Sequence, residues 1–370
     1  MKFQTLVLIL MILTLVSCDD DLSLKNNGNS TPGLDLTGLP FNPETYTVTS
    51  PIAFPQLEFP ADNPLTVDGV DLGRHLFYDP ILSVDSTLSC ASCHLQRGAF
   101  TDNLAVSPGV DSLTGTRSAM GLIDVGFHLN GLFWDGRSMS LEEQALLPVE
   151  DPIELNNTWP QVIEDLQAHD EYPARFRAAF GIENTSEITR ELAAKALAQF
   201  QRSIVSSGNS KYDKALAGRG ILTDQELMGL DIFFDEDINL PDGQCFHCHS
   251  APLFTDNLYR NNGLDTAPDF EDFPDLGQGG FTGERVENGR FRTPTLRNIE
   301  FSAPYMHDGR FETLDEVMDH YISGGNPSNN KDPLIDSIFL DNEQKAAVIA
   351  FLLTLSDTTA LNDPRYAKPE

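Results

Sequence analysis

Apolar residues recur at helical spacing in several stretches of this chain, whereas the strict alternation typical of strands is rare. The last stretch follows Asp341 and Gln344, whose spacing resembles a capping box at a helix start. The pattern therefore predicts a mainly α fold. Helices are expected over residues 72–77, 188–204, 228–234 and 347–355.

The N-terminal residues show a different pattern. Lys2 precedes an apolar run over residues 6–16, which ends in a lipobox-like string at Cys18. The run is too short to span a bilayer permanently, so residues 1–17 are expected to be a lipoprotein signal peptide. Lipid on Cys18 would anchor an exported protein to a bacterial membrane, facing the periplasm or the cell surface. An ordinary signal peptide with a chance cysteine is the less favoured alternative.

The rest of the chain divides into a tether and two domains. Residues 18–50 are rich in Asp, Asn, Gly, Ser, Thr and Pro without sustained periodicity, so a flexible tether is expected. The domains are expected over 51–215 and 216–370. Residues 265–288, which have no counterpart in the first domain, are expected to form a surface loop.

One motif occurs twice. Cys-x-x-Cys-His stands at 90–94 and again at 245–249, and Phe-Thr-Asp-Asn follows each copy closely. In c-type haem attachment the two thiols of this motif bond to the vinyl groups and the histidine ligates the iron. The sequence therefore predicts a duplicated haem domain. The two c-type haems are expected on Cys90, Cys93, His94, Cys245, Cys248 and His249.

The repeat continues downstream and bears on the second axial position of each iron. Residues 133–137 align with 306–310, and this register places Pro148 opposite Tyr321. A phenol can ligate ferric iron, whereas proline has no side-chain donor. We therefore expect Tyr321 to complete the second haem and the first haem to be open. Met318, one helical turn earlier, is the alternative ligand.

Three further side chains are candidates for chemistry at an open haem. Cleavage of peroxide requires a proton to move between its two oxygens, for which Glu154 is the candidate acid–base and Gln144 the candidate orienting group. Both residue types are more often found on the surface. Trp134 is a candidate electron conduit between the haems, although a lone tryptophan is more often a packing residue.

Composition and charge limit the classes of cofactor and binding partner that this protein can have. Cys18 is assigned to lipid and the other four cysteines to haem, so none of the five remains for a disulfide. The formal net charge of −32 argues against nucleic acid and anionic membrane surfaces. It suits a small basic electron carrier, and equally a solvated acidic surface.

From about residue 50 onward the chain resembles the bacterial di-haem cytochrome c peroxidase and MauG family. The resemblance rests on both haem motifs together with FWDGR (133–137), EEQALLPVEDPIE (142–154), RTPTLRNI (292–299) and APYMHDGR (303–310). It implies two tandem cytochrome c-like helical domains, with a peroxidatic N-terminal haem and an electron-transfer C-terminal haem. It further implies hydrogen peroxide as substrate, a small c-type cytochrome as donor, and a homodimer.

The resemblance also implies roles for individual residues. It places Trp134 at the inter-haem tryptophan and Gln144 and Glu154 at the distal pair of the first haem. A calcium ion lies between the domains in the family, and the backbones of Ser302 and Pro304 match two of its ligands.

The chain departs from the family pattern at several positions. Ser118 stands where the family has Asn, which weakens the calcium prediction. Residues 106–110 lack the distal histidine of many members, so we expect an open first haem without reductive activation; ligation by His128 would contradict this. Tyr321 replaces the methionine of classical members, as in MauG.

Three functions stay open. The first is a peroxidase that reduces hydrogen peroxide with electrons from a small cytochrome. The second is MauG-like oxidation of a protein substrate, which Tyr321 favours. The third is a plain electron carrier, which the unligating Pro148 opposes. A zinc protein is a distant alternative, because each Cys pair is followed by His and the pairs lie far apart.

Overall fold

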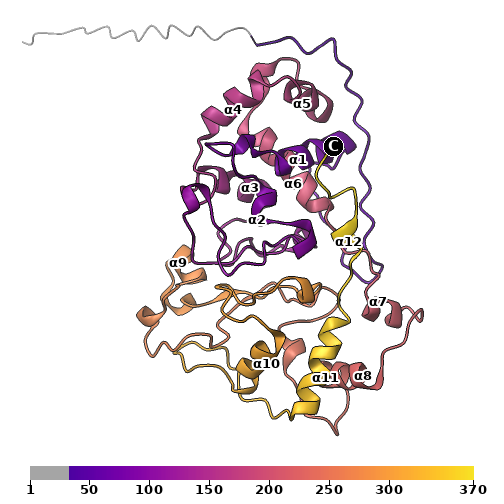
Figure 1. The fold of residues 1–370 in the computed structure, drawn as a ribbon, viewed down its shortest axis with the longest axis vertical. Helices are drawn as coiled ribbons and strands as arrows, with labels where there is room; N and C mark the ends of the chain where they lie inside the picture. Colours follow the sequence, from indigo (N-terminus) through magenta and orange to yellow (C-terminus); the bar gives the residue numbers. More distant parts are fainter. Residues whose placement is uncertain (1–32) are drawn as a thin grey trace, which may run out of the picture.

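The computed structural model describes residues 33–370, so the predicted signal peptide and Cys18 lie outside the described residues. Two helical lobes follow one another along the chain (Figure 1), as the mainly α prediction requires. No helix within residues 33–370 has the length and apolar character needed to cross a membrane.

The first lobe contains α1 (Val67–Tyr78), α2 (Cys90–Cys93), α3 (Leu141–Glu150), α4 (Trp159–Ala168), α5 (Tyr172–Phe180) and α6 (Arg190–Ser203), and α7 (Lys211–Leu216) leads to the second lobe. The second lobe contains α8 (Asp224–Phe234), α9 (Gln278–Thr282), α10 (Leu314–Ile322) and α11 (Asn342–Leu353), and α12 (Thr359–Asn362) follows. A small antiparallel sheet pairs β1 (Tyr259–Arg260) with β2 (Phe291–Arg292).

The helices expected from the hydrophobic pattern are confirmed. Residues 72–77 lie within α1, residues 228–234 within α8, and the long stripe forms α6. The predicted capping box of α11 is present: the Asp341 carboxylate accepts from the Gln344 amide at 2.9 Å, and the Gln344 side chain accepts from the Asp341 amide at 3.0 Å.

Each lobe is built on one pair of crossed helices, α1 with α6 and α8 with α11. A Cβ atom on Gly73 would lie 1.9 Å from the carbonyl oxygen of Ala196, and one on Gly229 would lie 2.0 Å from that of Ala347. Glycine is required because any side chain would hold the two backbones apart. The same close approach at matching positions shows that the duplication extends to helix packing.

The aromatic cores of the two lobes also match. The rings of Phe77 and Phe200 are 5.1 Å apart at 59°, and those of Phe233 and Phe351 are 5.1 Å apart at 57°. All four side chains are fully buried. Both pairs are tilted, and aromatic contacts at such centroid distances stabilise a core beyond their buried area.

Backbone strain is duplicated as well. Phe133 and Met306, which begin the aligned turns, have φ of 63° and 74°, and Phe100 and Phe254 have φ of 63° and 55°. Bulky residues rarely adopt positive φ, and such strain persists only where the surrounding structure imposes it. The loops around each haem motif are therefore held in one conformation by the same packing in both lobes.

The two ends of the described chain pack on the first lobe (Figure 1). Residues 33–50 were expected within a flexible tether, but Leu36 is buried and its amide donates to Glu183 at 2.8 Å. The tether prediction is therefore wrong for this part, because Leu36 adds to the apolar core. At the other end, Tyr366 donates to the Ser203 carbonyl at 2.8 Å, so the last residues leave the second lobe to which the sequence assigned them.

Ion pairs fix the connection between the lobes. Arg297 of the second lobe makes two 3.0 Å bonds to Asp213 in the connecting helix α7, and the Arg297 side chain is only 2% exposed. Arg117 of the first lobe bonds both carboxylate oxygens of Asp275 at 2.8 Å. Residues 265–288, expected as a surface loop, are thus anchored to the first lobe through Asp275.

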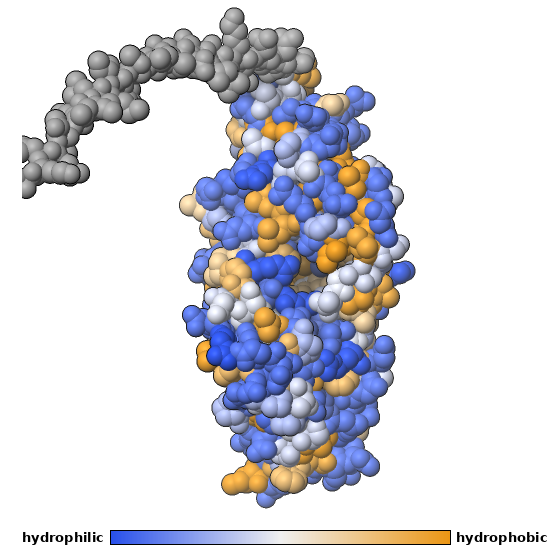
Figure 2. All heavy atoms as spheres, turned by 90° about the vertical axis from the view of Figure 1, so that its left-hand side faces the viewer, coloured by the Kyte–Doolittle hydropathy of each residue, from blue (hydrophilic) through white to orange (hydrophobic). Residues whose placement is uncertain are grey.

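The face of the molecule in Figure 2 is mostly hydrophilic, with small and separate apolar patches. Separate patches of this size are ordinary on soluble surfaces and give no sign of a large apolar docking site.

Candidate functional site

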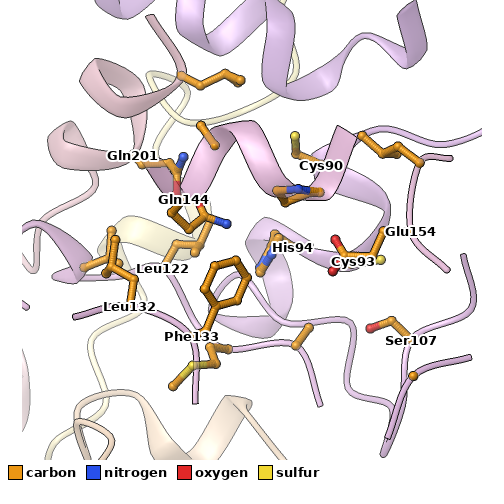
Figure 3. Close-up of a pocket in the computed structure, with 18 of the residues that line it drawn as sticks. Cys90, Cys93, His94, Ser107, Leu122, Leu132, Phe133, Gln144, Glu154 and Gln201 are labelled. Atoms are coloured by element: carbon orange, nitrogen blue, oxygen red, sulfur yellow. The ribbon is translucent and has the colours of Figure 1, made fainter. Parts of the chain in front are cut away.

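Each lobe encloses one cavity beside its Cys-x-x-Cys-His motif. The first cavity, about 230 Å³, is lined by Cys90, Cys93 and His94 together with Gln144, Pro148 and Glu154. In Figure 3, Gln144 and Glu154 reach the same space from opposite sides, with His94 between them in this view. Trp134 lines this cavity as well, so the structure brings together all the first-domain candidates.

The proximal histidines are oriented by the backbone. His94 Nδ1 lies 2.8 Å from the carbonyl oxygen of Phe100, and His249 Nδ1 lies 3.0 Å from that of Phe254. Because a carbonyl only accepts, Nδ1 carries the proton and Nε2 is left with a free lone pair, as an iron ligand needs. Burial lowers the pKa of both histidines and keeps them neutral.

The second cavity, about 190 Å³, is lined by Cys245, Cys248 and His249, with Tyr321 and Met318 from α10. Two thiols and one imidazole facing a largely apolar cavity are the donor set of a c-type haem, and both lobes supply it. No disulfide joins cysteines 90, 93, 245 and 248, so all four thiols are available for attachment.

Tyr321 is held by a residue that the sequence did not single out. The amide nitrogen of Asn262 lies 3.3 Å from the Tyr321 hydroxyl oxygen and 3.5 Å from the sulfur of Met306. Burial raises the pKa of Tyr321 to about 12, so the phenol would release its proton only when it binds iron.

Pro148 of α3 lines the first cavity, and Tyr321 of α10 lines the second. Proline has no side-chain donor, so Pro148 cannot ligate an iron there. Met120 also lines the first cavity, and its sulfur lies 3.5 Å from an Arg292 nitrogen. His94 is the only histidine among the described residues that line this cavity. Ligation by His128 would have contradicted the prediction of an open first haem. His128 is buried, does not line the first cavity, and accepts a hydrogen bond from Arg292.

Glu154 follows α3 and is fixed by its backbone. Its amide donates to Asp151 at 3.1 Å, and its carbonyl accepts from Val110 at 2.9 Å. Burial and, to a smaller extent, the negative charge of Asp151 raise the pKa of Glu154 to about 7, and the charge of Arg137 opposes them. A carboxyl group with this pKa can both accept and release a proton near neutral pH.

Trp134 lines both cavities. Its indole Nε1 donates to the Ser118 carbonyl at 3.0 Å, and its own carbonyl accepts from the Arg292 amide at 2.9 Å. Two hydrogen bonds thus hold this aromatic ring at the boundary between the lobes, where the sequence analysis expected an electron conduit.

The predicted calcium ligands lie at the same boundary. Asn103 of the first lobe donates to the carbonyls of Phe301 and Ala303 at 2.7 and 2.9 Å, next to Ser302 and Pro304. The Ser118 hydroxyl donates to the Met306 carbonyl at 3.2 Å. No group of three or more His, Cys, Asp or Glu residues within 33–370 is arranged for a metal ion, so calcium here would rely on carbonyl oxygens.

The remaining histidines lie outside the two cavities or at their edge. His75 Nδ1 lies 2.8 Å from the Asp71 carbonyl, and His320 Nε2 lies 3.0 Å from the Asn262 carbonyl. His307 lines the second cavity and stacks on Phe291 with ring centroids 3.6 Å apart. These contacts are packing and hydrogen bonds within the fold.

Comparisons with known proteins agree with this geometry. A family profile described as di-haem cytochrome c peroxidase matches residues 67–220. The chain is 35% identical over 298 residues to methylamine utilization protein MauG of Methylorubrum extorquens, covering 80% of both chains. It is 31% identical over 340 residues to cytochrome-c peroxidase IdrP1 of Denitromonas iodatirespirans, covering 84% of this chain and 88% of the relative.

A solved structure is also similar. It is a MauG-like protein associated with microbial copper homeostasis, with a TM-score of 0.80 and 34% sequence identity; the match covers 88% of this chain and 99% of that one. The similarity spans both lobes, including the half of the chain that the family profile does not reach.

Proposed function

We propose, because this chain belongs to the di-haem cytochrome c peroxidase and MauG family, that it reduces hydrogen peroxide to water with two electrons from a small c-type cytochrome. It is an oxidoreductase of that family and carries two c-type haems. The observation that carries the proposal is the first cavity, where a carboxyl group with its pKa raised to about 7 lies in the same lining as Pro148, which has no side-chain donor for iron.

A c-type haem with an open axial position supplies an iron that takes up peroxide and exchanges electrons. Glu154 accepts the proton from the peroxide oxygen nearer the iron and delivers it to the farther oxygen, which leaves as water. Two electrons and two further protons complete the second water. Gln144 holds the peroxide by its side-chain amide while the proton moves.

In this proposal Trp134 would pass electrons from a haem held in the second cavity to one held in the first. Trp134 suits this role because it lines both cavities and is fixed by hydrogen bonds at Nε1 and at its carbonyl. Tyr321 is the proposed sixth ligand of the C-terminal haem; as an anionic phenolate it stabilises ferric iron and lowers the potential.

MauG-like oxidation of a protein substrate is the second candidate. The observations that favour it are the 35% identity to MauG and the phenol of Tyr321 in the second cavity. A plain electron carrier fits less well, because Pro148 offers the first iron nothing to bind.

The test is hydrogen-peroxide-dependent oxidation of a reduced small cytochrome c by the isolated protein, starting from the fully oxidised state. We expect turnover without prior reduction, because His128 is bonded to Arg292 and is not among the residues that line the first cavity. Activity that appears only after half-reduction would refute the open first haem. Peroxide consumption without cytochrome oxidation in either state would favour the protein-substrate candidate.

We also propose that lipid on Cys18 anchors the mature protein to the membrane, facing the periplasm or the cell surface. The lipobox-like string is the observation that supports this. Replacing Cys18→Ser in the full-length chain should move the holoprotein from the membrane fraction to the soluble fraction. Unchanged partitioning would refute lipidation at this residue.

Calcium between the lobes and a homodimer complete the proposal. The carbonyls beside Ser302 and Pro304 support a weak calcium site, because Ser118 contributes a hydroxyl where an amide oxygen would bind more strongly. Chelation followed by re-addition of calcium should change the inter-haem electron-transfer rate, and sedimentation should give twice the monomer mass. An electron-transfer rate that chelation leaves unchanged would refute the calcium site. A sedimentation mass equal to that of the monomer would refute the homodimer.

A further inference from the structure

A buried guanidinium lies at the boundary between the two cavities. Arg292, in β2, lines both of them and is 3% exposed. Its backbone is fixed on two sides, by pairing with Tyr259 of β1 and by the hydrogen bond to the Trp134 carbonyl. The guanidinium is therefore held at the position from which both haem sites can be reached.

No carboxylate within residues 33–370 is paired with this cation. Arg292 donates to Nδ1 of His128 and, at 3.5 Å, to the sulfur of Met120, and both acceptors are uncharged. Its Nε is buried without any hydrogen-bond partner. Tyr259, which faces it across the sheet, uses its hydroxyl to donate to the Asn130 carbonyl at 2.9 Å.

The other arginines that line the cavities are all paired with carboxylates. Arg117 bonds Asp135 and Asp275, Arg137 bonds Asp135, and Arg260 bonds Asp256 and Asp332. The contrast is specific to Arg292, since no acidic side chain within residues 33–370 makes a salt bridge to it.

Burial of an unpaired charge is costly unless an anion compensates it. Burial lowers the pKa of Arg292 to about 10, so the guanidinium is still charged at neutral pH. His128 is neutral, because burial and the charge of Arg292 lower its pKa. An anion that enters with a cofactor would satisfy both the charge and the free Nε.

We propose that Arg292 is the shared counter-cation for propionate carboxylates of the two haems, positioned by His128 at the boundary between the cavities. A haem carries two carboxylates, and guanidinium pairs with carboxylate through two parallel hydrogen bonds. His128 holds one Nη, which leaves Nε and the rest of the fork for carboxylate. This assignment concerns haem binding and redox tuning, so it does not depend on which electron donor or substrate the enzyme uses.

Arg292 is thus a positioning and tuning residue whose charge acts on both irons. A nearby positive charge favours the ferrous form, since reduction adds an electron to the haem. Removing it should lower both midpoint potentials. The expected rise in the ferric-to-ferrous ratio at a fixed potential is about tenfold, equivalent to ~59 mV for a one-electron couple.

The experiment compares Arg292→Gln, Arg292→Lys and Arg290→Gln in the di-haem protein by spectroelectrochemistry and resonance Raman. Arg290 is the matched control: it stands two residues away and loses the same charge, but it lines neither cavity. Chloride and acetate are added in separate titrations to test whether a free anion occupies the site instead.

We expect both potentials to fall in Arg292→Gln and to be largely kept in Arg292→Lys and Arg290→Gln. The propionate bending bands should shift in Arg292→Lys, because the two-bond fork is lost, and this readout remains available if the glutamine variant fails to take up haem. Unchanged potentials in Arg292→Gln, or unchanged propionate bands in Arg292→Lys, would overturn the proposal. So would wild-type potentials that follow chloride or acetate concentration, which would assign the site to a free anion.

Discussion

Replacing Glu154→Gln tests the acid–base assignment most directly. The side chain lines the first cavity, and glutamine keeps its size and one acceptor oxygen while removing the titratable proton. Positioned acid–base groups contribute about 10²–10⁴-fold to rate, so kcat/KM for hydrogen peroxide should fall within that range. Glu150→Gln is the matched control, because Glu150 ends the preceding helix α3, is exposed and lines neither cavity.

The pH profile gives the sharper readout. Glu154 must be a carboxylate to accept the first proton, and its pKa is raised to about 7. The kcat/KM of the wild type should therefore fall about tenfold per pH unit below pH ~7 and level off above it. Asp151→Asn removes a negative charge that helps to raise this pKa, so it should move the rising part of the pH profile to lower pH.

The same shift predicts a stability change of definite sign. Because the folded pKa of Glu154 lies above its ordinary value of 4.5, the carboxylate destabilises the fold. This destabilisation is absent below pH ~4.5, where the carboxyl group is protonated in both the folded and the unfolded chain. It grows as the pH rises from the ordinary pKa to the folded pKa, and it is complete above pH ~7. Glu154→Gln should thus stabilise the protein at pH 8 by roughly 1–2 kcal/mol, after allowing for partial exposure, and hardly at pH 4.

The assay is steady-state oxidation of reduced cytochrome c by peroxide between pH 5 and 9, with thermal unfolding of the same variants at pH 4 and 8. A Glu154→Gln variant that keeps kcat/KM within about threefold of wild type would refute the acid–base role. If the pH profile of Asp151→Asn is not shifted, the fall in kcat/KM at low pH reflects the titration of a group other than Glu154.

The other predictions concern the second haem and the packing of the lobes. Tyr321→Phe should convert the second ferric haem from six- to five-coordinate in its absorption and EPR spectra, while Met318→Leu should not; the reverse result would make Met318 the ligand. Asp213→Asn leaves the buried Arg297 unpaired and should lower the free energy of unfolding by about 3–5 kcal/mol in denaturant titrations, against little change for the exposed Asp224→Asn. Gly229→Ala should cost about 1–3 kcal/mol or more by forcing α8 from α11, whereas Gly283→Ala, where the structure is open, would lose only its backbone preference.

The local features of this protein could be predicted from its sequence. The period of the apolar residues identified α6 and α11, and the spacing of Asp341 and Gln344 identified a helix start, because these signals act within a few residues. The two haem motifs likewise needed no tertiary information, since attachment chemistry is encoded in adjacent residues. The internal repeat also aligned Tyr321 with Pro148, and this alignment gave the prediction of a ligand for the second haem and none for the first.

Other features arise from contacts between residues far apart in the chain, which no local pattern reports. Leu36 packs into the first core and Tyr366 returns to the first lobe, although both segments are polar overall. Composition therefore indicated a tether and a simple second domain, whereas burial of a few apolar side chains decided otherwise. The sequence alone determined which residues can hold the haems; only the tertiary structure decided the raised pKa of Glu154 and the unpaired charge of Arg292, because burial and charge proximity depend on the folded chain.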